Sequence, residues 1–239
     1  DDLNNLALLL KETNRLAEAE PMLRRGLAIY EATLGPDDPR VATSLNNLAQ
    51  ALHVMSRFDE AEPLMSRALA IAETHSGLKH PMVAIQLNNL AMLLEATSRH
   101  AEAEPLLRRA LAINETSYGS EHPSLSIVLN NLAQVLRVTN RSAEAEPLML
   151  RALKIDMQSY GAKHPDVAIC LNNLATLFHS TNRTIKAEPL LRRARSIFIQ
   201  SLGPEHPYSQ SASTNYLAVL QSLGKSPTEI QALMASPDL

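Results

Sequence analysis

One short string recurs along this chain at a fixed interval. Leu-Asn-Asn-Leu-Ala begins at residues 3, 45, 87, 129 and 171, so each copy starts 42 residues after the last, and a degenerate copy follows at 213–217. Three other marks keep the same phase: Ala-Glu-Pro from 19, 61, 103, 145 and 187; Arg at 25, 67, 109, 151 and 193; and Gly at 35, 77, 119, 161 and 203. Such a period indicates stacked supersecondary units, each burying its apolar face against the next.

Apolar residues at helical spacing predict two helices in each repeat. In the second copy, the first helix (helix A) follows Pro39 and carries the stripe Val41, Leu45, Leu48, Ala49, Leu52 and Met55. The second (helix B) carries Phe58, Ala61, Met65, Ala68, Leu69 and Ala72, with Leu64 and Ile71 on its flank. Helix B is therefore expected to be buried on two sides, against its own helix A and against the next repeat.

Glycine, proline and asparagine mark the links. Helix B is expected to end at Gly77 as a left-handed C′ residue, and Gly-x-x-His-Pro, or Gly-Pro-Asp-Asp-Pro in the first copy, leads into the next helix A. The A–B turn carries Asn14, Ser56, Ser98, Asn140, Asn182 and Gly224. Asn and Gly tolerate the left-handed conformation that tight turns demand, whereas the two serines lack this explanation.

The repeats predict one domain over residues 1–239. Their approximate bounds are 1–38 (truncated at its start), 39–80, 81–122, 123–164, 165–206 and a degenerate capping repeat at 207–239. In the last, Ser226-Pro227 opens a helical run from Thr228 to Met234, interpreted as a truncated helix B. The chain starts in the middle of the pattern without an initiator Met, so we expect a fragment of a longer protein.

Charge and composition narrow the function classes. A formal charge of −3 and a pI near 6.3 give no electrostatic reason to expect a nucleic acid or an anionic membrane as partner. Cys170 is the single cysteine, which excludes an internal disulfide, and no run approaches the roughly 20 apolar residues that cross a bilayer. We expect a soluble, cytoplasmic protein.

The combination of Leu-Asn-Asn-Leu-Ala, Glu-Ala-Glu-Pro-Leu, Arg-Ala-Leu and Gly-x-x-His-Pro at 42 residues resembles the tetratricopeptide (TPR) domain of kinesin light chains, over essentially the whole chain. The resemblance implies an all-α fold, an α-solenoid in which TPR helix-turn-helix repeats form a right-handed superhelix. It also implies that the concave face, lined by A helices, receives peptide segments of partner proteins. In kinesin light chains these are cargo-adaptor peptides, often an aromatic residue among acidic ones, held by a basic groove.

This sequence departs from that family in two respects. The heptad region by which light chains join the motor is absent, and the expected groove carries mixed charges, with Lys11 and Arg137 against Glu12 and Glu95. We therefore expect a ligand of mixed character, whose apolar side chains rest near Met92, Val54, Val138 and Ile85.

Asparagine is the constant polar residue of helix A. Steps of about 100° per residue place Asn46, Gln50 and His53 away from the core-facing Leu45. A carboxamide offers one acceptor and two donors, so a row of them can pair with a peptide backbone whatever its side chains. The predicted peptide-binding residues are Asn4, Asn46, Asn88, Asn130, Asn172, Gln50, His53, Met92, Glu95, Gln134, Arg137 and His179.

A structural role for the asparagines is the alternative. One Asn of each pair can instead bond a neighbouring helix or turn and fix the repeat spacing. We favour the groove for the first Asn, and both interpretations stand for the second. The recurrent Arg on helix B, among the Glu of Ala-Glu-Ala-Glu, is interpreted as a solvated or salt-bridged surface rather than a phosphate track.

Enzyme chemistry is not expected. His80, His122, His164 and His206 belong to different repeats, separated by roughly 8–10 Å, whereas the ligands of one zinc all lie about 2 Å from it. Helix capping or packing before Pro is the simpler interpretation. Cys170 has no His–acid arrangement beside it, and almost all seven glycines end helices rather than form a phosphate loop. We expect no catalytic residue, cofactor or metal.

The sequence thus predicts a protein–protein interaction scaffold that binds peptide segments of partner proteins. The alternative function is a structural or self-associating spacer array within a larger signalling protein. Because helix A of the first repeat is cut at its start, its exposed end also predicts contacts between copies of the chain.

Overall fold

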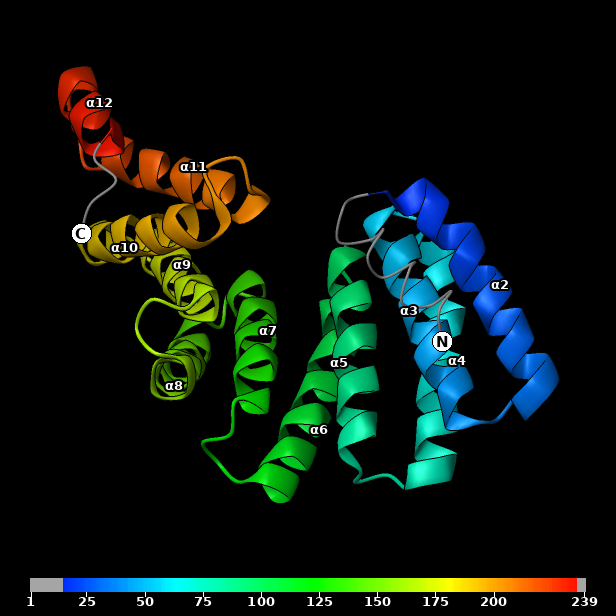
Figure 1. Ribbon diagram of the computed structural model, residues 1–239. Helices are drawn as coiled ribbons and strands as arrows, with labels where there is room; N and C mark the ends of the chain where they lie inside the picture. The colour runs from blue at the N-terminus through cyan, green and yellow to red at the C-terminus, as the bar shows by residue number, and fades with distance from the viewer. Residues whose placement is uncertain (1–14, 236–239) are drawn as a thin grey trace. The chain divides into compact units, whose positions relative to one another are not determined.

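The computed structural model describes residues 15–235, and these residues form α-helices joined by short links (Figure 1). The A helices are α3 (Pro39–Val54), α5 (Pro81–Ala96), α7 (Ser124–Val138), α9 (Pro165–Ser180) and α11 (Pro207–Ser222). The B helices are α2 (Leu16–Leu34), α4 (Phe58–Ser76), α6 (His100–Tyr118), α8 (Ser142–Tyr160) and α10 (Thr184–Leu202), and the short α12 (Pro227–Ala235) follows α11. The all-α prediction is confirmed, with consecutive helices packed as hairpins.

The described chain divides into two compact units, at Gly119 and Ser120. The first unit contains α2 to α6 and the second α7 to α12, and within each unit every helix packs against the next one along the chain. The division falls in a Gly-x-x-His-Pro link, where the sequence predicts a repeat boundary. A single domain over 1–239 stays a prediction.

The constant alanine of Ala-Glu-Pro lies at fully buried positions. Ala19, Ala61, Ala103, Ala145 and Ala187 are all 0% exposed. Each begins the buried stripe of a B helix, where a side chain of one methyl group lets a neighbouring helix approach closely. Because the interior is close-packed, a larger residue there should cost about 1–3 kcal/mol through overpacking.

The histidines of the links are helix caps. The Nδ1 atoms of His80, His164 and His206 accept hydrogen bonds from the backbone N–H two residues later, at 3.1, 3.2 and 3.2 Å. In the first copy the Asp38 carboxylate accepts the bond from Arg40 N–H at 2.9 Å instead. These bonds satisfy a donor that the first helical turn leaves without an intrahelical partner, so the capping interpretation is confirmed.

The turns between helices A and B use left-handed residues. Ser56, Ser98, Asn140 and Asn182 have φ of 58 to 61°, and Gly224 has φ of 70°. Ser56 and Ser98 therefore adopt the same strained conformation as the asparagines, without the side chain that best tolerates it.

The glycines that end the B helices differ from the prediction. Gly77 has φ 84° and ψ 155°, and the other four have φ of 85 to 90° and ψ of 158 to 173°. A left-handed C′ residue would have ψ near 47°. The chain leaves the helix extended, in a region that essentially only glycine occupies.

The recurrent arginine of helix B is a clamp between repeats. Its Nη2 donates to a backbone carbonyl 31 residues earlier, in the link of the preceding repeat, for Arg67, Arg109, Arg151 and Arg193 at 3.0, 3.3, 2.7 and 3.0 Å. Arg67 and Arg109 also pair with Glu31 and Glu73 of the preceding B helix, both at 2.5 Å. The salt-bridged interpretation is confirmed, and the carbonyl bond adds a fixed register.

A second arginine, in the A–B turn, joins the same layers. Arg99 pairs with Glu62 of the preceding Ala-Glu-Pro at 2.6 Å and with Glu102 at 2.7 Å, and Arg183 pairs with Glu146 at 2.8 Å. Exposed pairs contribute little singly. Their regular recurrence nevertheless shows that the constant residues of the B helices and turns serve the stacking of repeats.

Candidate binding site on the A helices

The predicted site residues other than the asparagines lie at partly exposed positions. These side chains are neither buried nor fully exposed. They are Gln50 and His53 on α3, Met92 and Glu95 on α5, Gln134 and Arg137 on α7, and His179 on α9. Asn4 lies outside the described residues. The A helices of both units therefore carry predicted site residues that are accessible to a ligand.

Some of these side chains already have partners within the chain. Arg137 Nε donates to Gln134 Oε1 at 3.1 Å, and His179 Nδ1 lies 3.3 Å from Thr184 Oγ1. The His53 ring lies 5.6 Å from the Phe58 ring, and burial lowers the pKa of this histidine. A ligand at these positions would meet neutral or internally paired groups and the Glu95 carboxylate, rather than an open basic track.

The asparagines form bonds between successive A helices. Asn89 Nδ2 donates to Asn46 Oδ1 at 2.9 Å, which joins α5 to α3, and Asn215 Nδ2 donates to Asn172 Oδ1 at 3.0 Å, which joins α11 to α9. The second Asn of one repeat thus bonds the first Asn of the repeat before it. These two bonds support the structural alternative for the pairs.

The first asparagines are less open than expected. Asn46, Asn88 and Asn130 are each 7% exposed, and Asn172 is partly exposed. The expectation of an open carboxamide is therefore corrected at three positions; Asn46 is bonded by Asn89 of α5, and Asn130 bonds Cys170 of α9. A role of these residues in ligand binding stays a prediction.

Aliphatic side chains recur on the exposed side of the A helices. Ile85 on α5 and Ile127 on α7 stand at the same repeat position and are 54% and 59% exposed. Val54 and Val138, at the ends of α3 and α7, are 60% and 37% exposed. The apolar surface predicted near Val54, Val138 and Ile85 is thus accessible in both units.

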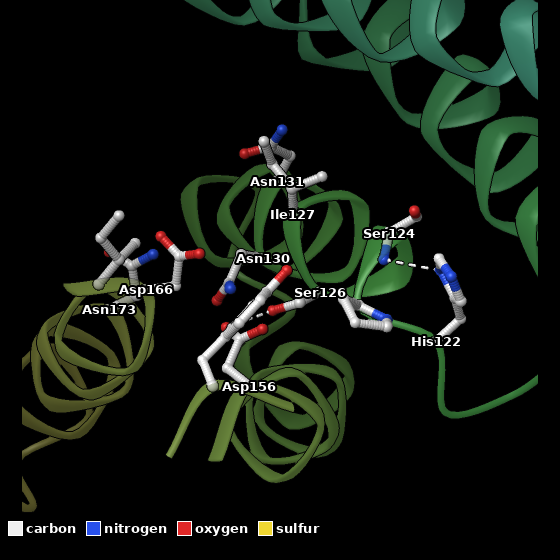
Figure 2. A pocket seen from close by; sticks show the side chains of 12 residues that line it. His122, Ser124, Ser126, Ile127, Asn130, Asn131, Asp156, Asp166 and Asn173 are labelled. Atoms are coloured by element: carbon white, nitrogen blue, oxygen red, sulfur yellow. Dashed lines mark hydrogen bonds between the residues drawn. The ribbon is translucent and has the colours of Figure 1, made fainter. Parts of the chain in front are cut away.

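The second unit contains a pocket of about 520 Å³ at α7, α8 and α9 (Figure 2). Ser126 and Asn130 of α7 and Asp156 of α8 point toward one another, and Asp166 and Asn173 come from α9. Of the predicted site residues, the structure brings only Asn130 into this pocket.

A buried carboxylate forms the floor of the pocket. Asp156 is 3% exposed, and its Oδ2 accepts hydrogen bonds from Ser126 Oγ at 2.6 Å and from Cys170 Sγ at 3.1 Å. Burial raises the pKa of Asp156, against the opposing effect of these two bonds. Burial also raises the pKa of Cys170 to about 12, which favours the protonated thiol at neutral pH.

The sequence interpretation missed Asp156 and Ser126, although a signal was present. At the position of Asp156 the other repeats carry Tyr30, Ala72, Asn114 and Phe198, and at the position of Ser126 they carry Ala42, Ala84, Ala168 and Gln210. A carboxylate and a hydroxyl that replace mostly apolar residues on core-facing positions of one repeat indicate a polar site there.

Within residues 15–235, no group of three or more His, Cys, Asp or Glu side chains could hold a metal ion. No helix in the same range is both long and apolar enough to span a membrane.

A family model described as tetratricopeptide repeat matches residues 3–74, 82–158 and 128–200. No curated protein matches the sequence significantly. Among solved structures, the chain is similar to nearly identical TPR-like repeats of a protein assigned as a kinesin light chain in Podosopora anserina. The sequences are 25% identical, the TM-score is 0.68, and the match covers 84% of this chain and 95% of that one. BtubC (BKLC) from P. vanneervenii shares the fold, with 21% identity, a TM-score of 0.73 and coverage of 92% and 87%.

Proposed function

The chain belongs to the tetratricopeptide repeat family, and from this premise we propose that its A helices bind an extended segment of a partner protein. Arrays of this family generally serve as protein–protein interaction modules. No catalytic role enters the proposal.

The observation that carries the proposal is the apolar surface that the A helices leave open. Ile85 and Ile127 stand at one repeat position and are more than half exposed. Burial of apolar surface is worth roughly 25 cal/mol per Å², so each of these isoleucines offers an apolar anchor to a ligand on the A helices of its own unit. The fold itself makes little use of these two side chains.

Polar residues beside the apolar anchors complete the proposed site. In the first unit these are Gln50, His53 and Glu95, with Met92 as a further apolar contact, and in the second Gln134, Arg137 and His179. Each ligand hydrogen bond is worth only about 0.5–1.5 kcal/mol net, so several must act together. The first asparagine of each repeat is proposed chiefly to position the A helices; these residues are Asn46, Asn88, Asn130 and Asn172.

A selection from a random peptide library on the intact chain tests the proposal. Ile85→Lys should weaken the selected peptides about tenfold or more, because it places a charge among apolar contacts. Ile185→Lys is the matched control: Ile185 lies on the B helix α10 and is 81% exposed, so peptide affinity should stay unchanged. Failure to select any peptide, or equal effects of both variants, would contradict the proposal.

The asparagine bonds favour a second candidate, a structural or self-associating array. In this alternative the bonds Asn89–Asn46 and Asn215–Asn172 hold a stiff spacer, and the exposed repeat ends join copies of the chain. Sedimentation equilibrium separates the two candidates. A molar mass that rises with concentration, together with no selected peptide, supports the array. A constant monomer mass with bound peptide supports the interaction module.

A further inference from the structure

The bond between successive A helices is missing at one place in the second unit. By the pattern of Asn89–Asn46 and Asn215–Asn172, Asn173 of α9 should donate to Asn130 of α7. Within residues 15–235 no hydrogen bond joins this pair. Asn130 Nδ2 instead donates to Cys170 Sγ at 3.0 Å, and Asn130 Oδ1 is a buried acceptor with no partner in the described chain.

A buried acceptor without a donor is unfavourable, because it loses its hydrogen bonds to water and gains none in return. Asn130 is 7% exposed and lines the pocket of the second unit (Figure 2). Its Oδ1 has almost no accessible surface, so a donor from a ligand would supply the missing bond once the amide turns toward the pocket.

The carboxylate beside it has free acceptor capacity as well. Asp156 Oδ2 accepts both bonds described above, whereas Oδ1 accepts none from the described residues. Asp166, on α9, adds a second carboxylate to the lining. The twelve lining residues include no lysine or arginine. Asp166 Oδ2 lies 3.6 Å from His164 Nδ1, whereas Asp156 has no ion-pair partner among the described residues, and a buried carboxylate without a cation is costly.

The walls of the pocket suit a flat group on an apolar stem. Ile127, Ile169 and Pro123 line it with apolar surface. Tyr160 contributes an aromatic ring, which stacks on His164 with the ring centroids 4.6 Å apart. Aromatic rings attract cations, and a guanidinium group also stacks on them through its planar face.

We propose that this pocket binds the arginine side chain of a partner segment, with the guanidinium donating to Asp156 Oδ1 and Asn130 Oδ1 and the methylene stem lying against Ile127 and Ile169. An arginine offers five N–H donors in a fixed plane, which suits acceptors on two helices. A lysine ammonium is compact and strongly hydrated, and it fits such a spread of acceptors less well. The inference rests on the proposed function, because it takes the arginine from a bound protein segment.

The pocket also sets a register for the partner. In the other described copies, the position of Asp156 carries Tyr30, Ala72, Asn114 or Phe198, none of them a carboxylate. A bound segment would accordingly place one arginine at α7–α9 and use apolar contacts elsewhere.

Methyl NMR of the intact chain tests the pocket directly. The probe is Nα-acetyl-arginine methylamide, and the neutral isostere Nα-acetyl-citrulline methylamide is its reference. The signals of Ile127 and Ile169 should shift with the arginine probe, and that of Ile85, the counterpart of Ile127 in the first unit, should not. The citrulline probe should bind at least about tenfold more weakly, since charge-assisted bonds are about twice as strong as neutral ones. The lysine probe should also bind at least about tenfold more weakly, because its compact, strongly hydrated ammonium fits the spread of acceptors less well.

Asp156→Asn is the decisive variant. The position 42 residues earlier is Asn114, 6% exposed, so the repeat accommodates a buried amide there. The variant should stay folded and lose about tenfold to a hundredfold in affinity for the arginine probe. Asp59→Asn, an exposed site on α4, changes the net charge equally and should have no effect. Unchanged binding in Asp156→Asn, or equal binding of the citrulline or lysine probe, would overturn the inference.

Library-selected peptides separate this inference from the proposed function. If the peptides depend on Ile85 but keep their affinity when every arginine is replaced by citrulline, the A-helix proposal stands and the arginine pocket is wrong. If the arginine probe binds and no peptide is selected, the pocket is a site for small guanidinium ligands. The proposed function is then wrong, and so is the inference that the arginine belongs to a partner protein.

Discussion

Asn89 on α5 donates its side-chain amide to Asn46 Oδ1 on α3 at 2.9 Å, and so couples two successive A helices through the most constant residues of the repeat. The bond joins residues of neighbouring copies rather than a copy to itself. It assigns at least part of the Leu-Asn-Asn-Leu-Ala signature to stacking, and it makes the missing bond at Asn130 a local specialisation.

Removal of this bond should destabilise the first unit. In Asn89→Ala, the buried Asn46 Oδ1 loses its donor, and we expect a cost of about 1–3 kcal/mol in the free energy of unfolding. Urea denaturation followed by circular dichroism measures it. Ser66→Ala, at an exposed site on α4, should change stability by less than about 0.5 kcal/mol. Equal effects of the two substitutions would show that the bond contributes nothing.

Replacement of the serines in the A–B turns by glycine should increase the stability of the fold. Ser56 and Ser98 have φ of 58° and 61°, where asparagine and glycine are less strained. Ser56→Gly should therefore raise the thermal midpoint, with a gain of about 0.5–1 kcal/mol. The reverse change, Asn140→Ser, should lower it. A loss of stability in Ser56→Gly would indicate that the serine makes a compensating interaction.

The glycines that end the B helices should resist substitution by asparagine. Gly77 combines φ 84° with ψ 155°, outside the left-handed helical region that asparagine tolerates. We expect both Gly77→Asn and Gly77→Ala to cost about 1–3 kcal/mol by denaturant unfolding. If Gly77→Asn were neutral while Gly77→Ala was not, the conformation at Gly77 would be the left-handed one that the sequence predicts.

The buried Asp156 should make stability pH-dependent. Burial raises its pKa in the folded chain, so between the unfolded and the folded pKa the folded state binds more protons than the unfolded state. The free energy of unfolding attributable to this group therefore falls as pH rises through that window and stays lower at neutral pH. Asp156→Asn lacks the effect.

Urea midpoints of both chains from pH 4 to 8 measure this difference. We expect the stability of Asp156→Asn relative to the parent chain to increase toward neutral pH. Asp59→Asn is the control, since Asp59 is exposed. A difference between Asp156→Asn and parent that does not vary with pH would contradict a buried, ionising carboxylate.

Much of the fold follows from the sequence because the same helix and turn signals recur in each copy of the repeat. The spacing of Leu45, Leu48 and Leu52 predicts helix A, and proline and glycine mark the ends of the helices. The prediction for Gly77 was right about positive φ and wrong about ψ, because residue type reports tolerance and not the conformation adopted.

The candidate site was less predictable. A helical projection places Asn46 on one side of its helix, but it does not reveal that Asn89 of the next helix covers it. Asp156 is harder to predict because the constant residues of helix B indicate a structural role, and only its difference from Tyr30, Ala72, Asn114 and Phe198 marks it. The sequence shows on which side of its helix a residue lies, but it does not show which residue of the neighbouring helix lies against it.

Photo-crosslinking tests the central claim most directly. A library-selected peptide that carries benzoylphenylalanine is irradiated with the intact chain, and the crosslinked residues are identified by mass spectrometry. We expect crosslinks in the A helices, within residues 39–54, 81–96, 124–138 and 165–180. Crosslinks confined to the B helices, within 58–76, 100–118, 142–160 and 184–202, would contradict it.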